Sequence, residues 1–201
     1  MTLYIILITI IVSIIAFQNQ SLKYKLMFRP YMVSSQNEWY RFLTSGFIHA
    51  DWLHLLINMF VLYSFGQAVE VYYEYAFPAH HTYYFILLYL GAIVISDLPT
   101  YKKHMHDHTY NGLGASGGVS AILFASIIFN PWQKIYLYGI IGIPGIVAGA
   151  AYLIYSYYMD KKGNTHINHG AHFWGAVYGL IFTIALQPSL ALMFFQRLIE
   201  F

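Results

Sequence analysis

Six apolar stretches, separated by shorter polar segments, organise the chain. They cover residues 3–17, 52–72, 82–98, 113–129, 135–158 and 171–192. A helix needs roughly 20 apolar residues to cross a bilayer, and most of these stretches approach that length. The pattern predicts an all-α polytopic membrane protein with six transmembrane helices in a single domain, residues 1–201.

Composition supports this prediction. Hydrophobic residues make up 59% of the chain and charged residues 9%, against about 25% charged residues in ordinary soluble domains. This small number of charged residues cannot cover a surface that faces water. We therefore expect the protein to lie in a lipid bilayer. The net charge of +2 is too weak to indicate a nucleic-acid partner. The absence of cysteine excludes disulfides, a thiol nucleophile and cysteine-ligated metals.

The ends of the stretches add detail. Residues 3–17 lack a basic segment before them and a small-residue cleavage site after them, so we expect a retained span rather than a signal peptide. Gln187-Pro188 interrupts the last stretch and predicts a kink there. The long segment 18–51 mixes aromatic and basic residues, which is typical of short helices at a membrane interface.

Charge also bears on orientation. Most basic residues follow the first, third and fifth stretches: Lys23, Lys25, Arg29, Arg41, Lys102, Lys103, Lys161 and Lys162. The opposite side carries only Lys134 and Arg197. The positive-inside rule therefore places the loops after the odd-numbered spans in the cytoplasm.

Three polar groups lie near the starts of the second, fourth and sixth stretches. They are marked by His54, Ser116 and His172. Alternating spans run in the same direction, so these residues should reach one face of the membrane at a similar shallow depth. Because polar groups are costly in hydrocarbon, the shared position indicates function.

Helical spacing indicates how the three groups could meet. His54 and Asn58 are four residues apart and share a helix face. Gly175 and Gly179 form a Gly-x-x-x-Gly pattern, which lets membrane helices approach closely, and they lie on the same side of their helix as His172. Glycines also surround Ser116: Gly112, Gly114, Gly117 and Gly118. Two glycine-rich surfaces in contact would bring a serine and a histidine within hydrogen-bond reach.

This arrangement permits nucleophilic acyl transfer. A serine attacks a carbonyl when a neighbouring base accepts its proton, and histidine suits that role. The Ser116 N–H, His54 and Asn58 are candidate donors to the oxyanion. No carboxylate stands out as a partner for His172, so we expect a dyad rather than a triad.

Several alternatives remain open. Small residues around Ser116 are also common where membrane helices simply pack. Ser120, one turn after Ser116, is a second candidate nucleophile. His104, His106 and His108 would share one side of an extended segment and, with His166 and His169, could bind copper or zinc. We favour a solvated interfacial loop for that segment and expect neither a metal nor a cofactor.

With these motifs the chain resembles the rhomboid family of intramembrane serine proteases. Tyr40-Arg41 resembles the family's Trp-Arg pair, and His49, His54 and Asn58 match the second-span pattern. Gly114-Ala115-Ser116-Gly117 matches the nucleophile motif, and Ala171-His172-x2-Gly175-x3-Gly179 matches the last-span motif. The matches cover nearly the whole chain and imply a six-helix rhomboid-like bundle with an interfacial first loop.

The resemblance implies a role for each matched residue. Ser116 would be the nucleophile, His172 the base, and His54, Asn58 and the Ser116 amide the oxyanion hole. Supporting roles would fall to His49 as a structural hydrogen-bonding residue, to Gly114, Gly117, Gly175 and Gly179 in packing, to Arg41 in the first loop, and to Glu70 in tying the second span to neighbouring loops. The fifth span and the loop after it would gate the substrate.

The resemblance also implies substrates and location. Substrates would be membrane-anchored proteins cut within or beside a transmembrane helix, and the enzyme would be a multi-pass protein of the bacterial cytoplasmic (inner) membrane. The common family topology places the active site outward, opposite to the orientation that the charges indicate, and the sequence sets no oligomeric state. Many members carry an aromatic residue four positions after the serine, where this chain has Ser120. An inactive relative that binds transmembrane clients is the alternative function.

Overall fold

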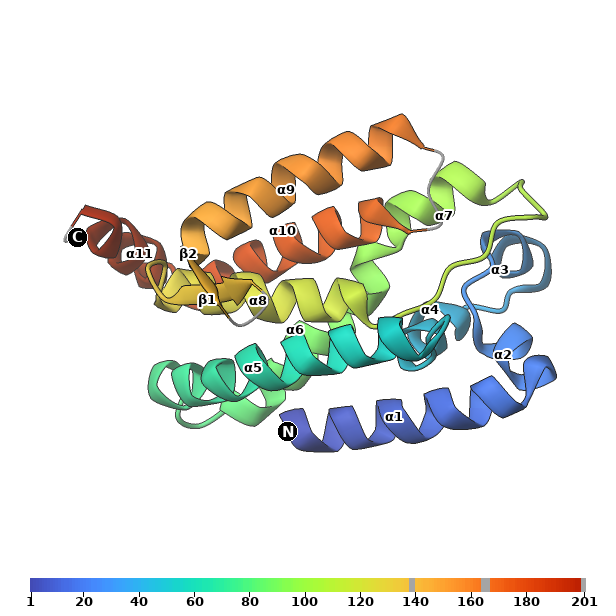
Figure 1. Cartoon of the computed structure of the whole chain (residues 1–201), viewed down its shortest axis with the longest axis horizontal. Helices are drawn as coiled ribbons and strands as arrows, with labels where there is room; N and C mark the ends of the chain where they lie inside the picture. The colour runs from blue at the N-terminus through green and yellow to red at the C-terminus, as the bar shows by residue number, and fades with distance from the viewer. Residues whose placement is uncertain (138–139, 164–166, 200–201) are drawn as a thin grey trace.

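Six long helices form a bundle in the computed structural model, which describes residues 1–137, 140–163 and 167–199. They are α1 (Thr2–Gln18), α5 (Trp52–Ala76), α6 (His81–Ser96), α8 (Ser116–Phe129), α9 (Gly145–Lys162) and α10 (His169–Leu186). Figure 1 shows α5, α8 and α10 running in one direction and α1, α6 and α9 in the other. The prediction that the even-numbered spans share a direction is confirmed.

By length and apolarity, two helical segments of the described chain can each cross a membrane. They are α5 and the continuous stretch His81–His104, which joins α6 to α7 (Leu98–His104). A third is obtained if α10 and α11 (Ser189–Ile199) count as one span bent by 113°. The bend follows Gln187 and confirms the predicted kink. α1 and α8 are apolar but shorter, so the count of six spans stays a prediction.

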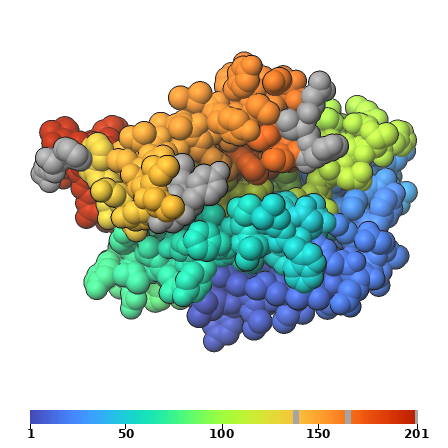
Figure 2. Space-filling view, in the orientation of Figure 1, coloured from blue at the N-terminus to red at the C-terminus, as the bar shows by residue number. Residues whose placement is uncertain are grey.

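The outward faces of the first helices are apolar. Large side chains of α1 and α5 are exposed along their length: Leu3, Leu7, Ile8, Ile11, Leu53, Leu56, Ile57 and Phe60. In Figure 2, α1 and α5 form the lower part of the visible face, and α9 with the hairpin before it forms the upper part. A surface of this kind is suited to lipid tails.

α8 is the central helix. Twelve of its 14 residues are buried, and α5, α6, α9 and α10 all pack against it. Its small residues allow this close packing: a methyl group added at Gly118 would lie 2.8 Å from the ring of Tyr89 in α6. The sequence therefore buries a short helix at the centre of the bundle and leaves longer helices around it.

The segment between α1 and α5 folds into the short helices that the sequence predicts. These are α2 (Gln20–Leu26), α3 (Pro30–Gln36), α4 (Arg41–Thr44) and a 3-10 turn, η1 (Ser45–Phe47). Phe28, Val33 and Phe42 form a separate small core beneath them. The backbone of Phe28 also pairs with Gly112, which ties the segment to the chain just before α8.

The fifth apolar stretch differs from its prediction. A helix was expected from residue 135, but strands β1 (Lys134–Leu137) and β2 (Ile141–Pro144) form an antiparallel hairpin there, with Lys134 opposite Pro144. The all-α prediction is wrong at this point. β-Branched and aromatic residues favour strands, and Pro144, which has no backbone N–H, immediately precedes α9.

Candidate active site

Ser116 is the first residue of α8, and a glycine turn leads the chain into it. Gly114 has φ of 122°, in the region that favours glycine. A methyl group at Gly114 would also lie 2.6 Å from the His54 ring. Backbone N–H groups in the first turn of a helix lack acceptors within that helix. The partly exposed Ser116 hydroxyl therefore lies beside N–H donors that are suited to an anion.

The register between α8 and α10 is set by two backbone contacts. A methyl group at Gly175 would collide with the backbone of Gly117, and one at Gly179 would collide with that of Ala121. Both pairs are separated by 58 in sequence number, so the helices run parallel with one register. His172 is then level with Gly114, about 3 Å of helix rise from Ser116. Side chains lean toward the N-terminus of their helix, and because the two helices are parallel, the Ser116 and His172 side chains lean in the same direction and keep this small offset.

The imidazole of His172 is partly buried between two rings. Its centroid lies 6.0 Å from that of Tyr152 in α9, with the planes 11° apart, and 5.7 Å from that of His169. No hydrogen bond joins Ser116 to His172 within the described parts of the chain. Catalytic hydrogen bonds often tighten only when substrate binds.

His54 reaches the same place from α5, and Asn58 lies one turn after it on that helix. Asp51 caps this helix by accepting a hydrogen bond of 2.8 Å from the His54 backbone N–H, and the His54 ring lies against Gly114. The Asn58 amide donates to the His54 carbonyl at 2.9 Å. Because this amide carries two hydrogens, one remains for a further acceptor.

His49 connects three parts of the bundle. Its Nε2 accepts from the Ala115 backbone N–H at 3.4 Å, so its Nδ1 carries the proton and donates to Ser13 of α1 at 3.0 Å. The Ser13 hydroxyl in turn donates to the Phe47 carbonyl. Burial is the main cause that lowers the pKa of His49 to about 3. The neutral ring therefore ties the residue before Ser116 to α1.

Two charged residues that were predicted to have supporting roles make their contacts away from the candidate active site. Arg41 is 3% exposed, donates to the carbonyls of Tyr24 and Met27, and pairs with Glu38 at 2.5 Å. It therefore holds the short helices of the first loop together. Glu70 accepts from the amino group of Met1 at 2.8 Å and from the Thr2 backbone N–H. The resemblance implied contacts with loops, but the structure places Glu70 against the first turn of α1.

Residues that the sequence analysis did not select hold the start of α10. The Asn168 side-chain oxygen accepts from the Ala171 N–H at 3.1 Å and from the Thr100 hydroxyl at 3.2 Å. The Asn168 amide donates to Asp97 at 3.1 Å. An asparagine just before an apolar helix is a helix-start signal, so Asn168 could have been found. Its partners 68 and 71 residues away could not.

The histidine-rich segment does not take the extended form required by the metal hypothesis. His104 is the last residue of α7, and its ring stacks on Tyr110 at 4.0 Å. The His108 ring lies 3.7 Å from that of Tyr31. Hydrogen bonds from Thr109 lower the pKa of the neighbouring Asp107 to about 2. The described residues contain no group of three potential metal ligands, and His166 lies outside them.

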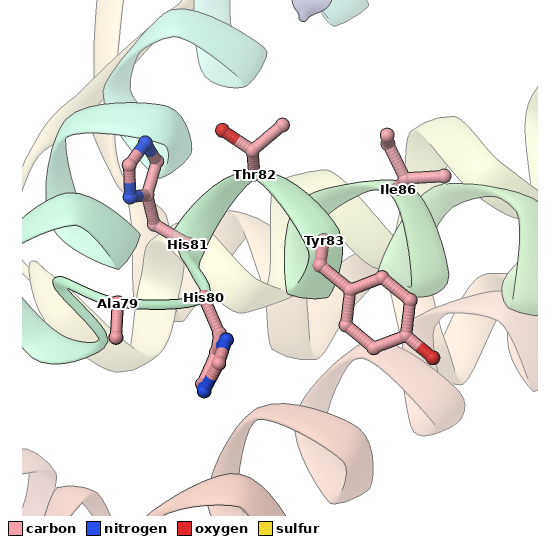
Figure 3. Close-up of a pocket in the computed structure, with 6 residues that line it drawn as sticks. All are labelled: Ala79, His80, His81, Thr82, Tyr83 and Ile86. Carbon is pink, nitrogen blue, oxygen red and sulfur yellow. The ribbon is translucent and has the colours of Figure 1, made fainter.

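A second histidine pair lies at the far end of the bundle. His80 and His81 line a hollow at the start of α6 with Ala79, Thr82, Tyr83 and Ile86. Figure 3 shows the two imidazole rings pointing to opposite sides of the chain. The His81 ring donates from Nδ1 to the Pro78 carbonyl, 3.1 Å away. This pair lies at the end of α5 opposite to His54.

Several known proteins are similar in sequence to this chain. A family model described as "Rhomboid domain" matches residues 36–189. Rhomboid-like protein 11, chloroplastic, of Arabidopsis thaliana is 31% identical over 79% of the chain and 57% of its own length. RHOMBOID-like protein 12, mitochondrial, of the same plant is 27% identical over 77% of the chain and 50% of its own length.

A bacterial relative is also similar. YdcA of Bacillus subtilis (strain 168), a candidate rhomboid protease, is 27% identical over 73% of the chain and 67% of its own length. The chain thus spans about half the length of the two plant relatives. Together with the apolar helices, the family match over most of the sequence shows that this integral membrane protein belongs to the rhomboid family, which generally consists of intramembrane serine proteases.

Proposed function

We propose that the chain is an intramembrane serine endopeptidase that uses Ser116 as nucleophile and His172 as general base. The register of α8 against α10 is the observation that carries this proposal. Because glycines bring the two backbones into contact at Gly117 and Ala121, a serine and a histidine near the helix starts lie within about 3 Å of each other along the helix axes. The His54 ring lies at the same level, against Gly114.

The length of α8 supports a site below the membrane surface. Its 14 residues span about 21 Å, which is shorter than the roughly 30 Å hydrocarbon core. If the far end of α8 reaches the opposite interface, Ser116 lies several ångströms inside the bilayer. A peptide bond of a membrane-embedded segment would meet the nucleophile there. In this proposal all six long helices span the membrane.

The proposed chemistry has two halves. The Ser116 oxygen attacks the carbonyl carbon of the scissile bond while its proton moves to the His172 ring, and the first-turn N–H groups, His54 and Asn58 hydrogen-bond the oxyanion. The C–N bond then breaks, and the proton passes to the leaving amine. Water attacks the acyl-serine ester and its proton moves to His172; the ester C–O bond then breaks, and that proton passes from His172 to the departing oxygen to restore the Ser116 hydroxyl.

The substrates that fit this site are membrane-anchored proteins with a helix that unwinds near the cleavage point, because only an extended backbone exposes its carbonyl to attack. The family implies such substrates and a multi-pass location. For a bacterial source, the cytoplasmic (inner) membrane is the expected place. We propose that α9 and the chain after it form the entry side.

The test is covalent labelling by a fluorophosphonate, followed by intact-protein and peptide mass spectrometry. The purified protein in detergent should gain one adduct, on Ser116. Ser116→Ala should abolish the adduct and the cleavage of a reconstituted transmembrane substrate, whereas Ser120→Ala should retain both. Ser120→Ala is the matched control because it removes a hydroxyl from the same helix one turn away.

Two results would contradict this proposal. An adduct on Ser120, or cleavage that persists in Ser116→Ala, would rule out the assigned nucleophile. No adduct and no cleavage in the unaltered protein would favour the alternative, a rhomboid-like protein that binds transmembrane clients without cutting them.

A further inference from the structure

The ring against His172 comes from a helix that carries no other residue of the proposed active site. Tyr152 lies in α9, and its ring is nearly parallel to the imidazole, 11° between planes at 6.0 Å. His169 contacts the same imidazole edge-on at 5.7 Å. Tyr155, three residues after Tyr152, contacts His169 at 5.5 Å. One face of α9 therefore holds both imidazoles of α10.

Tyr152 also contacts the helix of the nucleophile. Its hydroxyl lies 2.7 Å from the hydroxyl of Ser120, which is one helical turn after Ser116. A single side chain thus joins α9, α8 and α10 directly beside the proposed dyad. The hydrogen bond to Ser120 is one contact of this tyrosine, and its ring also packs against Phe124 of α8 with centroids 5.9 Å apart, so the ring against which His172 lies is held without the hydroxyl as well.

The two halves of α9 are attached differently. Near its start the helix lies close to α8, because a methyl group at Gly149 would be 2.8 Å from Ile127. Farther along, its contacts with α10 include three pairs of rings: Tyr152 with His172, Tyr155 with His169, and Tyr157 with Phe173 at 5.6 Å. Near its end the Asp160 side chain also lies close to Gly170. α9 lies at the edge of the bundle, with much of its surface exposed (Figures 1 and 2). We infer that its second half separates from α10 by parting side chains.

We propose that Tyr152 is a positioning residue that holds the His172 ring in the orientation for proton transfer and thereby couples the position of α9 to the competence of the base. The inference rests on the proposed function. His172 must aim one ring nitrogen at the Ser116 oxygen, and an imidazole turns about two side-chain bonds. Stacking against a fixed ring restricts that rotation. Displacement of α9 withdraws the ring, so the base is fully oriented only when α9 is packed against α10.

Tyr152 takes no proton in the reaction. The proton moves from the Ser116 oxygen to His172. Among the described residues, the Tyr152 phenol makes its hydrogen bond with Ser120. Loss of the ring should therefore lower kcat and the rate of probe acylation, and leave the KM of a transmembrane substrate unchanged. A residue that only gated substrate entry would leave acylation by a small probe at its original rate.

The first test removes the ring. Tyr152→Leu and Tyr152→Met should each lower both the rate of fluorophosphonate labelling and kcat by about ten- to a hundredfold, the range for a lost aromatic contact and a misplaced catalytic group. Tyr152→Phe keeps the ring and should stay within about threefold of the parent. Tyr158→Leu is the matched control, since it removes an exposed tyrosine from the same helix.

The second test moves the ring to another helix. The Ser120 side chain points to the Tyr152 hydroxyl, so Ser120→Tyr combined with Tyr152→Leu would supply a ring from α8 into the vacated space. This double variant should label faster than Tyr152→Leu alone. Rescue by a ring on a different helix distinguishes ring support of the base from a general loss of packing.

Three results would overturn this inference: an unchanged labelling rate in Tyr152→Leu or Tyr152→Met, an equal loss in Tyr158→Leu, or loss of protein cleavage with unchanged probe labelling. Thermal unfolding in detergent identifies variants that do not fold. A parent protein that is not labelled at Ser116 would instead contradict the proposed function, so the two failures are distinct.

Discussion

α10 meets its two neighbours in different ways. Against α8 it places glycines whose missing side chains let the backbones touch, at Gly175 and Gly179. Against α9 it places rings, His172 and His169, that meet Tyr152 and Tyr155. A backbone contact has no rotamers and tolerates no added atom, whereas a ring contact can open and close. Under the proposed function the difference separates two tasks: the glycine contact sets the level of His172 relative to Ser116, and the ring contact sets the orientation of its imidazole.

Removing the His172 imidazole should have the largest effect on activity. His172→Ala should lower the turnover of a reconstituted transmembrane substrate by roughly 10⁶, as loss of a catalytic serine or histidine does in a soluble serine protease. Thermal unfolding in detergent should change little, because the imidazole makes no hydrogen bond among the described residues. Retention of more than about one per cent of the activity would show that another group is the base.

Loss of an oxyanion donor should have the next largest effect. His54→Ala should lower kcat by about 10²–10³, the usual effect of removing one such donor. The measurement is steady-state cleavage, with His106→Ala as control because His106 is exposed in the segment after α7. A loss of less than threefold would place His54 outside the oxyanion hole and leave the start of α8 as the source of donors.

A glycine-to-alanine substitution can be compared at two contacts of α8, one with α10 and one with α9. Gly175→Ala drives a methyl group into the backbone of Gly117 and should cost about 3 kcal/mol or more in the free energy of unfolding. Gly149→Ala in α9 meets the end of the Ile127 side chain at 2.8 Å, which can move, and should cost about 1 kcal/mol or less. Equal costs, measured by reversible unfolding in mixed micelles, would contradict a rigid α8–α10 contact.

The smallest predicted effect is a pH dependence of stability. The folded pKa of His49 is about 3, below its ordinary value of 6.5, so the unfolded chain binds more protons between these values. The stability that the neutral ring provides is present above pH 6.5 and is lost as pH falls toward 3. His49→Gln should flatten the fall in melting temperature between pH 7 and 5, whereas His106→Gln should leave it unchanged. Parallel curves for the parent and His49→Gln would show that the ring is not buried neutral.

Much of the architecture could be predicted because hydrophobic length and glycine spacing are local signals. The direction of the even-numbered spans, the short helices between α1 and α5 and the bend after Gln187 are all confirmed. The hairpin before α9 was missed because a short apolar run with β-branched residues fits either a strand or a buried helix. The extended segment that the metal alternative required is not formed at His104, because α7 continues as far as that residue.

The residues of the candidate site also fall into those selected from the sequence and one that only the structure revealed. Ser116, His172, His54 and Asn58 were selected from their order and spacing, and they remain a proposal. The ring against His172 was not predicted, because Ser120 takes the place where many relatives have an aromatic residue. Tyr152 lies 20 residues before His172 in the sequence, and no spacing rule links the two.

The sequence by itself determined the family, the membrane setting and the surfaces along which helices can touch, because hydrophobic runs and missing side chains act within one helix. Only the tertiary structure decided which ring of α9 stacks on His172, how His49 bridges Ser13 to the residue before Ser116, and which carboxylate holds the start of α10. Those contacts join residues 20 to 71 positions apart. Their partners follow from how whole helices pack, and packing is a property of the assembled bundle rather than of any one segment.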